Sequence, residues 1–546
     1  MKHQNISKWT RCFFVWALPT QKNTFREALT VALPAFVNTP LSDFSKPQVR
    51  AAFQQALEHV ERSLGGEYPL VIGGKRVTTS AWIDSIDPSQ RERIAGRVAK
   101  AGQPEAERAI EAAEAAFADW SRTFAEERAR IGFRAAEIMR RRRHEMSATM
   151  VFEIGKTWVE ADADTAEAID FLEFYAREAV RLAEPQPIVR VKGTANELVY
   201  LPLGVGIAIP PWNFPVAIAT GLVSSAVLGG NTVIFKPSSL TPVCGAKIVE
   251  ILEEAGLPPG VVNFLPGPGD TLGDYLVGHP RTRFISFTGS HEVGIHINEV
   301  GAKVQPGQRW LKRVIAEMGG KDAIVVDRSA DVEQAVAGIT ASAFGFQGQK
   351  CSACSRVIAD AAIYDEVVQR VARRAEELRV GPPQLYESDM GPVADASQFK
   401  KVAEYVEIGR REARLLAGGE LDDSVGYFVR PTVFADAAPD SRIMQEEIFG
   451  PVLAMTSAKD FDDALAIANG TAYGLTGGVY ARDAAKLARA RREFHVGNLY
   501  FNRKITGALV GVEPFGGFNM SGTDSKAGGY DYLKLFVQAK VISQHA

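Results

Sequence analysis

The sequence predicts an α/β protein with a doubly wound parallel sheet of the Rossmann type. Short apolar runs such as residues 232–235 (TVIF) and 284–287 (FISF) alternate along the chain with helical stretches such as residues 216–228. The runs are apolar throughout, which is the pattern of strands in a parallel sheet that is covered on both faces. Right-handed βαβ units in series then build a nucleotide-binding fold.

The remaining elements extend this pattern in both directions. Apolar residues recur at helical spacing over residues 46–63, and Gly73-Gly74-Lys75 between apolar runs at 70–72 and 77–79 is typical of a β-hairpin. Residues 103–181 are rich in Ala, Glu and Arg and are expected to be helical. We expect two α/β domains with terminal extensions. Further strands are expected at 204–209 and 261–265, further helices at 244–255, 364–378 and 461–468, and a second βα series from Ala323 to about Val496.

Length, charge and cysteine content narrow the class of protein. With 546 residues, 46% of them hydrophobic and 23% charged, the chain is too long for one compact core and too apolar for disorder. Lys and Arg number 62 against 65 Asp and Glu, a net charge of −3 that disfavours a nucleic-acid partner.

No apolar run is long enough for a membrane span, so no membrane partner is expected. Residues 12–18 are apolar but lack a signal-peptide cleavage site, so a loose tail is expected there. Four cysteines indicate a reducing, cytoplasmic setting.

Three glycine turns are candidates for dinucleotide binding. The turns at 204–206 (GVG) and 267–273 (GPGDTLG) each depart from the G-x-G-x-x-G fingerprint. The turn at 287–290 (FTGS) fits better, because a buried strand ends there and a helix opens, which offers backbone N–H groups to a pyrophosphate. Lys236 follows the strand TVIF, where a lysine can hold a ribose or a phosphate. An ordinary strand-turn-helix and a surface lysine are the alternatives.

Candidate catalytic groups lie in other turns. Cys351 follows a glycine-rich stretch and is a candidate nucleophile, whereas Cys354 is expected to be a buried, inert thiol. Glu317 ends a strand before two glycines and is a candidate general base, with a surface turn as the alternative. Asn213, in the stiff loop PPWNFP, is a candidate oxyanion donor or a loop brace. The histidines lack zinc spacing, so no metal is expected.

In this order the motifs resemble those of the NAD(P)-dependent aldehyde dehydrogenase superfamily. The matching stretches are PWNFP (211–215), FKPSS (235–239), FTGS (287–290), AEMGGK (316–321), GQKCSA (348–353), EEIFGPV (446–452) and PFGGFNMSG (514–522). The resemblance runs from about Tyr68 to Gln538. It implies a Rossmann-type cofactor domain over 46–318 with an arm near 184–202, a catalytic domain over 319–510, an oligomerisation segment over 511–546, and an N-terminal extension over 1–45.

A narrower resemblance is to the branch that oxidises L-glutamate γ-semialdehyde to L-glutamate at the end of proline catabolism. It rests on FNRKITGALVG (501–511), PFGGFNMSGTDSKAGG (514–529), FGFQGQKCSACSR (344–356) and EADADTAEAIDF (160–171). The resemblance implies a homo-oligomer that exchanges a β-arm, and functional coupling to a separate proline dehydrogenase.

The resemblance also implies roles for single residues. Cys351 would attack the aldehyde to give a thiohemiacetal and then a thioester, Asn213 would hold the oxyanion, and Glu317 would activate water. Lys236 would bind the adenosine ribose, and Glu447 the nicotinamide ribose with Phe449 beside it. The other implied cofactor residues are Ile209, Pro210, Pro211, Trp212, Ser238, Ser239, Gly269, Gly289, Ser290, Val293, Met318 and Gly319. The implied substrate residues are Phe214, Ser352, Gly507, Ala508, Phe515 and Glu167.

One residue departs from the NAD-preferring pattern, in which many family members carry Glu three residues after the lysine. Ser239 stands there in this chain, and a neutral serine would not repel a 2′-phosphate. NAD is therefore expected to be preferred with some use of NADP. Three alternatives stay open: another semialdehyde dehydrogenase such as one for succinic semialdehyde, a cysteine hydrolase, and a non-catalytic binding protein.

Overall fold

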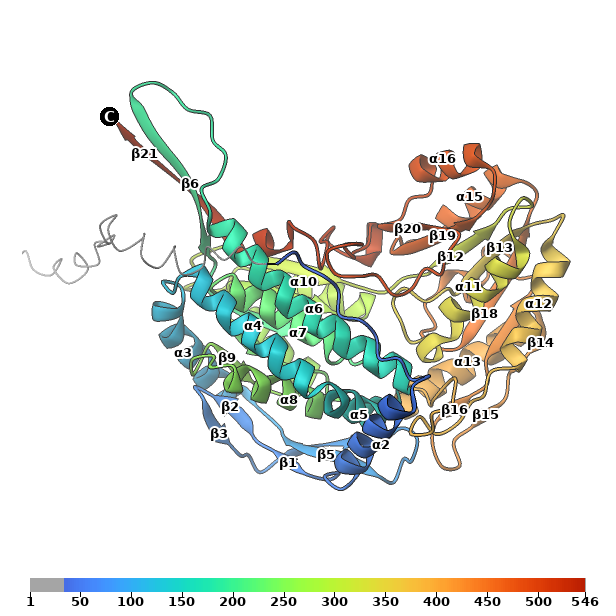
Figure 1. Ribbon diagram of the computed structural model, residues 1–546, viewed down its shortest axis with the longest axis horizontal. Helices are drawn as coiled ribbons and strands as arrows, with labels where there is room; N and C mark the ends of the chain where they lie inside the picture. Colours follow the sequence, from blue (N-terminus) through green and yellow to red (C-terminus); the bar gives the residue numbers. More distant parts are fainter. Residues whose placement is uncertain (1–33, 546) are drawn as a thin grey trace, which may run out of the picture. The chain divides into compact units, whose positions relative to one another are not determined.

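The computed structural model describes residues 34–545. The chain divides into two compact units, Met1–Val37 and Asn38–Ala546. Of the first unit only residues 34–37 are described, and they form no helix or strand. The predicted loose tail and its apolar run at 12–18 lie outside the described residues. All that follows concerns the second unit (Figure 1).

The first large sheet has seven strands in the order β11-β10-β7-β8-β9-β2-β3. Its centre is parallel and buried, with Ile207 of β7 paired to Ile285 of β10 on one side and to Ile234 of β8 on the other. This confirms the predicted doubly wound sheet. The strands are β2 Leu70–Ile72, β3 Lys75–Val77, β7 Val205–Ile209, β8 Thr232–Phe235, β9 Val262–Phe264, β10 Phe284–Thr288 and β11 Arg313–Glu317.

The hairpin at the edge of this sheet is tighter than the sequence suggested. Gly73 and Gly74 alone make the turn, with φ of 59° and 77°, so Lys75 already belongs to β3 and pairs with Ile72. The predicted second strand at 77–79 was therefore placed two residues late. Two consecutive residues with positive φ match the right-handed twist of the strands, and glycine adopts that conformation without steric cost.

Helices cover both faces of the first sheet, and a small sheet extends it. The predicted helical stretch 103–181 consists of four helices, and Gly155, in the left-handed conformation, ends the third of them. The bounds are α2 Pro47–Glu61, α3 Gln103–Trp120, α4 Ala125–Arg141, α5 Arg143–Ile154, α6 Trp158–Ala183, α7 Ala217–Leu228, α8 Pro242–Glu254, a π-turn Gly269–Gly273, α9 Asp274–Gly278 and α10 His291–Ala302. The small sheet is β1 Glu67–Tyr68, β5 Ile94–Ala99 and β4 Trp82–Ile86.

The second large sheet is also seven-stranded, in the order β14-β17-β18-β13-β12-β19-β20. It is parallel except for β14, and its core strands are fully buried. The strands are β12 Ala323–Val326, β13 Arg356–Asp360, β14 Arg414–Ala417, β17 Thr432–Ala435, β18 Val452–Ala458, β19 Thr476–Tyr480 and β20 Asn498–Phe501, with β15 Leu421–Asp422 and β16 Phe428–Val429 as a separate pair. The helices are α11 Val332–Phe344, α12 Tyr364–Glu376, α13 Ala396–Glu412, α14 Arg442–Gln445, α15 Phe461–Asn469 and α16 Ala484–Glu493.

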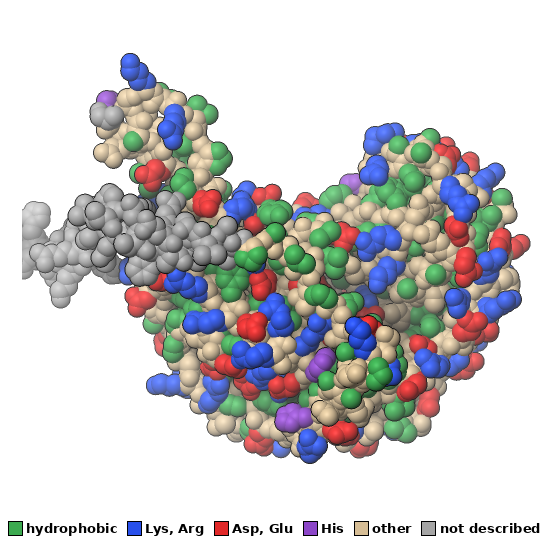
Figure 2. Space-filling view, in the orientation of Figure 1, with side chains coloured by type: hydrophobic (Ala, Val, Ile, Leu, Met, Phe, Trp, Pro, Cys, Tyr) green, Lys and Arg blue, Asp and Glu red, His purple; other side chains and the backbone are tan. Residues whose placement is uncertain are grey.

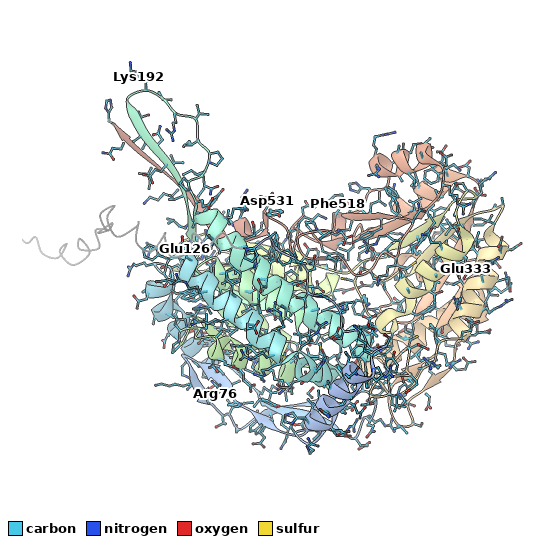
Figure 3. All side chains as sticks on the ribbon, viewed as in Figure 1. Arg76, Glu126, Lys192, Glu333, Phe518 and Asp531 are labelled. Carbon is cyan, nitrogen blue, oxygen red and sulfur yellow. The ribbon has the colours of Figure 1, made fainter. Side chains whose placement is uncertain are left out.

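The C-terminal segment returns from the second sheet to the first. This segment contains Phe518 and Asp531, which are labelled in Figure 3. Each of these residues directly precedes a short 3₁₀ turn, at Asn519–Ser521 and at Tyr532–Phe536. The segment then ends in β21 Val537–His545, which pairs antiparallel with β6 Thr194–Pro202 along its whole length. This two-stranded ribbon projects from the rest of the unit (Figure 1), and its strand β6 lies within residues 184–202, for which the family resemblance implied an arm.

Residues 38–45, which the sequence placed in the N-terminal extension, pack against α6. Asn38 Nδ2 donates to Asp170 Oδ2 at 2.9 Å, and the Ser42 backbone N donates to Asp162 Oδ2 at 2.7 Å. The ring of Phe44 is buried against Trp158. These contacts anchor the last part of the extension.

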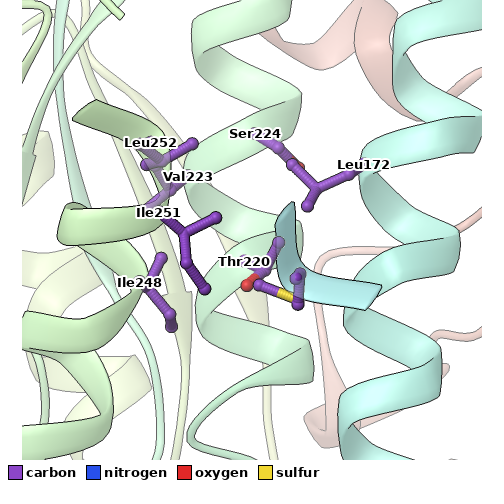
Figure 4. Close-up of a pocket in the computed structure, with 8 residues that line it drawn as sticks. Leu172, Thr220, Val223, Ser224, Ile248, Ile251 and Leu252 are labelled. Carbon is purple, nitrogen blue, oxygen red and sulfur yellow. The ribbon is translucent and has the colours of Figure 1, made fainter. Parts of the chain in front are cut away.

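A small closed cavity lies among α4, α6, α7 and α8 (Figure 4). About 10 Å³ of it admits the centre of a water molecule, and its lining includes Met139, Leu172 and Ile248. The hydroxyls of Thr220 and Ser224 also reach it, and neither has a hydrogen-bond partner within the described chain. The space is enough for one water molecule.

The surface shows no field of a single sign on the face in Figure 2, where acidic and basic side chains are interspersed. This agrees with the near-neutral composition. Among the described residues, no helix is long and apolar enough to cross a membrane.

Candidate active site

The predicted catalytic residues come from strand ends of the first sheet and from a loop before a strand of the second. Asn213 lies four residues after β7, Glu317 is the last residue of β11, and Cys351 stands between α11 and β13. Ligands of open α/β sheets bind beyond the carboxyl ends of the strands. The local geometry of each residue shows how the chain holds it there.

The loop that leads to Cys351 has an unusual backbone. Phe346 and Gln347 are non-glycine residues with φ of 48° and 57°, a conformation that persists only where surrounding contacts enforce it. Gln347 Nε2 supplies such contacts, since it donates to Gly155 O at 3.2 Å and to Pro392 O at 2.6 Å. The loop before the thiol is therefore fixed by side chains of other segments.

The two thiols of the C-x-x-C stretch differ. Burial, followed by the charges of Asp322 and Glu447, raises the pKa of the Cys351 thiol above its usual value, so the resting thiol is protonated at neutral pH. Cys354 is only 1% exposed, and its Sγ lies 3.3 Å from Arg356 O. Its burial is as predicted for a thiol without a chemical role.

Asn213 contacts the cysteine loop directly. Its side chain is 3% exposed, and Nδ2 donates to Gln349 O at 2.9 Å, two residues before Cys351. An amide nitrogen carries two hydrogens, so one fixes the side chain and the other is left for a ligand. The amide therefore braces the loop and also offers a hydrogen-bond donor. The two roles that the sequence left as alternatives, oxyanion donor and loop brace, are compatible in this geometry.

Glu317 is held by the C-terminal segment. Ser525 Oγ donates to Oε1 and the Gly517 backbone N donates to Oε2 at 3.2 Å. A Cβ at Gly516 would collide with Ser525 O and lie 2.8 Å from Glu317 Oε1, so glycine is needed there, and a Cβ at Gly522 would lie 3.1 Å from Oε2. Burial raises the pKa of Glu317 to about 8, although the Ser525 hydrogen bond opposes the shift. With 7% exposure, the carboxyl group is not part of a surface turn.

The predicted adenosine-side residues lie at the carboxyl ends of β8 and β10. Lys236 is 5% exposed, so it is not a surface lysine, and burial with no carboxylate beside it among the described residues lowers its pKa to about 8. Gly289 and Ser290 open α10, and Ser290 Oγ accepts a hydrogen bond from the Val293 N–H at 3.3 Å. The turn at 267–273 lies beside Lys236, because a Cβ at Gly273 would be 3.7 Å from Lys236 Cε.

Close backbone approach shapes the surroundings of Glu447 and the cysteine loop. Glu447 Oε1 accepts a hydrogen bond from the Gly320 N–H at 2.9 Å, and a Cβ at Gly319 would collide with the Glu447 carboxylate. A Cβ at Gly320 would lie 2.8 Å from Cys351 O. Glu447 and the cysteine loop therefore flank the same pair of glycines.

The remaining predicted cofactor residues border this region. Phe449 has φ of 61°, and its ring meets the Trp212 ring edge-on, 5.3 Å between centroids. Met318 packs on Gly294 of α10. Ile209, Pro210 and Pro211 continue the end of β7, Ser238 and Ser239 follow Lys236 with Ser239 exposed, and Gly269 and Val293 are exposed at the starts of their helical turns.

The predicted substrate residues are less tightly gathered. Phe214 follows Asn213 and is half-buried, and Ser352 follows Cys351 with 8% exposure. Gly507 has φ of 77° in an exposed loop, next to Ala508. Phe515 bridges to Ala527 through backbone hydrogen bonds of 2.9 and 2.8 Å. Burial, then the charge of Asp164, raises the pKa of Glu167 to about 8.

Several side chains that hold the site were not predicted. Ser525 and Gly517 hold Glu317, and the buried pair Lys156–Asp164 lies behind Phe214. Ser525 and Gly517 meet Glu317, and Lys156 meets Phe214, across large sequence separations, so no local pattern marks these contacts. Within residues 34–545, no three His, Cys, Asp or Glu side chains form a group that could hold a metal ion.

The chain belongs to the aldehyde dehydrogenase family, whose model matches residues 76–542. More narrowly, it is 60% identical over 509 residues to 1-pyrroline-5-carboxylate dehydrogenase of Geobacillus sp. (strain WCH70), covering 93% of this chain and 99% of that protein. A crystal structure of 1-pyrroline-5-carboxylate dehydrogenase from Thermus with bound NAD has a TM-score of 0.93 and 53% identity, covering 94% of this chain and 100% of that one.

A longer protein contains a similar region. Proline utilization A from Bdellovibrio bacteriovorus matches with a TM-score of 0.92 and 42% identity, over 94% of this chain and 54% of that chain. The match therefore covers this chain almost completely, and about half of the other.

Proposed function

We propose that this chain oxidises L-glutamate γ-semialdehyde, the open form of 1-pyrroline-5-carboxylate, to L-glutamate with NAD as the oxidant. The observation that carries the proposal is that Asn213 is hydrogen-bonded to the loop of Cys351 and that the glycine pair after Glu317 packs against that loop and Glu447, in a chain that is 60% identical over 93% of its length to a 1-pyrroline-5-carboxylate dehydrogenase. The reaction is the second step of proline breakdown.

The groups around Lys236, the start of α10 and Glu447 suit a dinucleotide. Lys236 offers a buried ammonium with no carboxylate partner among the described residues, and the start of α10 offers backbone N–H groups to an anion. At the other end Gly319 lets backbone approach Glu447, whose carboxylate can take ribose hydroxyls. NAD, when bound, supplies the acceptor for the hydride. We assign residues 46–318 to cofactor binding and 319–510 to the domain of the catalytic thiol.

In the first chemical step the Cys351 thiol gives up its proton to solvent water, and Sγ attacks the aldehyde carbon. The tetrahedral thiohemiacetal carries an oxyanion, which the free N–H of Asn213 and the Cys351 backbone N–H stabilise. Because Asn213 is already fixed to Gln349 O, its amide needs little reorganisation when the charge develops. Loss of hydride from this adduct leaves a thioester on Cys351.

In the second chemical step Glu317 removes a proton from water, which attacks the thioester and releases L-glutamate. A base of this kind works best when its pKa lies near the working pH, and burial raises the pKa of Glu317 to about 8. The carboxyl group must leave Ser525 and Gly517 to reach the thioester, and the glycines around it leave room for that movement.

The α-amino acid end of the substrate is assigned to the loop of Gly507 and Ala508, with Ser352 beside the thiol. Glycine at positive φ presents backbone N–H groups that can bind a carboxylate. Phe214 and Phe515 would enclose the aliphatic part, and Glu167 would face the polar end.

Cofactor choice rests on Ser239. It is exposed and neutral, so we propose that NAD is preferred and NADP is used more slowly. Steady-state rates with both cofactors, for wild type and Ser239→Glu, test this. We expect the substitution to abolish the NADP rate and keep the NAD rate, whereas strict NADP dependence of wild type would contradict the assignment.

The exposed arm suggests a homo-oligomer. Seven of nine residues of β21 are exposed, and an isolated two-stranded ribbon is marginally stable in water. We propose that a second copy of the chain covers it. Light scattering on the full chain and on a chain ending at Phe536 tests this, and an unchanged mass for the shortened, folded chain would contradict it.

The need for a free Cys351 thiol also favours a reducing compartment such as the cytoplasm.

The decisive experiment measures NADH formation from L-glutamate γ-semialdehyde beside succinic semialdehyde and simple aliphatic aldehydes. We expect the highest kcat/KM for the α-amino acid semialdehyde and no activity for Cys351→Ala, with Cys354→Ala as a matched control that keeps activity. Preference for another aldehyde would overturn the substrate, and equal rates for wild type and Cys351→Ala would overturn the mechanism.

A further inference from the structure

A buried ion pair lies directly behind the proposed site, outside the machinery described so far. Lys156 follows the left-handed Gly155 between α5 and α6, and Asp164 lies in the second turn of α6. Lys156 Nζ is 2.7 Å from Asp164 Oδ2, and both side chains are 0% exposed. Asp164 Oδ1 accepts a 2.5 Å hydrogen bond from the Ala217 N–H at the start of α7. The carboxylate is thus fixed between two elements.

The ammonium group of Lys156 contacts two aromatic rings. Its Nζ lies 3.9 Å from the centroid of the Phe214 ring and 4.6 Å from that of the Phe346 ring. A cation this close to a ring face is attracted to it, most strongly where water is excluded. One lysine therefore touches both the residue after Asn213 and the strained loop before Cys351.

A second contact ties the same segment to the same loop. Gly155 O, one residue before Lys156, accepts the hydrogen bond from Gln347 Nε2. Glu160 and Glu167 on α6 also feel the charge of Lys156, but Glu160 is paired with Lys350, 2.7 Å between Oε2 and Nζ. The Gly155–Lys156 segment thus meets the cysteine loop through one backbone carbonyl and one ammonium.

The choice of an ion pair here needs explanation. A methionine has nearly the same length as a lysine, and replacing buried ion pairs by apolar groups is often neutral or stabilising. Burial alone does not account for Lys156. What an apolar side chain lacks is the directed attraction to two ring faces and to the carboxylate, which fixes the rings at one distance.

From this geometry we propose that Lys156, held by Asp164, is a positioning residue for the oxidation: it sets the Phe214 ring beside the oxyanion donor and the Phe346 ring in the loop that carries the nucleophile. This inference rests on the proposed function for its substrate readout. The expected effect on the position of the cysteine loop does not depend on the substrate. Displacing reacting groups by about 1 Å can cost roughly a hundredfold in rate, so the effect is measurable.

The test compares two double variants of the full chain. Lys156→Met with Asp164→Asn removes the charge pair and keeps an acceptor for the Ala217 N–H. The control, Arg143→Met with Asp162→Asn, removes a 2.6 Å ion pair between α5 and α6 that touches neither ring. Unfolding midpoints, kcat, KM and the rate of Cys351 alkylation by iodoacetamide are measured for each.

We expect the Lys156 variant to lose roughly 10–100-fold in kcat/KM and to alkylate more slowly, with KM and kcat both changed. The control is expected to lose stability only. A folded Lys156 variant with the kinetics and alkylation rate of wild type would overturn the proposal. Failure of wild type to oxidise the semialdehyde would instead overturn the proposed function, and the alkylation result would still decide the positioning role.

A third variant decides if the Lys156 variant does not fold. Phe346→Leu removes one ring and leaves the ion pair and Phe214 in place. We expect slower alkylation of Cys351 with an unchanged KM for the semialdehyde. An alkylation rate equal to that of wild type would show that the Phe346 contact does not set the position of the loop.

Discussion

Hydrolysis of the thioester should depend on pH through Glu317. Burial raises the pKa of this carboxyl to about 8, and only the ionised form can take a proton from water. Roughly 9% is ionised at about pH 7 and roughly 91% at about pH 9, so the rate should rise about tenfold between them. Below its pKa the group is protonated and deacylation slows.

The Ser525 hydroxyl provides a graded change in that profile. Its hydrogen bond to Glu317 stabilises the carboxylate and lowers the pKa. Ser525→Ala should therefore move the midpoint to higher pH by about one unit. Ser525→Thr, which keeps the hydroxyl, is the matched control and should leave the midpoint in place.

The assay isolates the second chemical step. The acyl-enzyme is formed at low pH, freed of substrate, shifted to a series of higher pH values, and followed by intact mass as the thioester disappears. Because the thiol is already acylated, its own titration does not enter. A rate that is flat with pH, or one that Glu317→Gln leaves unchanged, would refute the role given to Glu317.

Three further substitutions test other parts of the account. Asn213→Ala should lower kcat about 100–1000-fold in steady-state assays, because one oxyanion donor is lost; a loss confined to KM would contradict its role. Gly319→Ala should raise the KM for NAD, since the added Cβ meets the Glu447 carboxylate; an unchanged KM would show that Glu447 does not bind the cofactor. In urea unfolding, Thr220→Val should change stability by less than about 0.5 kcal/mol, because its hydroxyl has no partner in the described chain. Thr232→Val should cost about 1 kcal/mol, because the Thr232 hydroxyl donates to Ala113 O at 3.0 Å. Equal losses would mean that the Thr220 hydroxyl is satisfied by water.

The central fold was predictable because its signals are local. The run TVIF coincides with β8, and the run FISF falls one residue short of β10. A strand buried on both faces must be apolar at every position, so composition alone reveals it. The edge hairpin was displaced because Lys75 was taken as part of the turn, although two glycines close it.

The arm is a different case. Strand β21 is exposed along nearly its whole length, so its sequence carries no burial pattern, and its partner β6 lies far away in the chain. An exposed ribbon of this kind shows no apolar periodicity from which either strand could be read. Only the resemblance to a known family pointed to an arm near 184–202.

The residues of the candidate site also fall into two groups, those that a local pattern marks and those that it does not. Glycine and proline around Cys351, Glu317 and Asn213 marked these positions, because close backbone approach needs those residues. Ser525, which donates to Glu317, and Lys156, which contacts the Phe214 ring, carry no local signal, since each meets its partner only in the folded chain.

The central claim, covalent catalysis by Cys351, is tested most directly by trapping the thioester. Glu317→Gln is mixed with L-glutamate γ-semialdehyde and NAD, quenched in acid and mapped by mass spectrometry, while NADH is counted in the same sample. The account predicts one NADH per site and a glutamyl adduct on the peptide at Cys351 alone. NADH formed continuously without an adduct, or an adduct at Cys354, would contradict it.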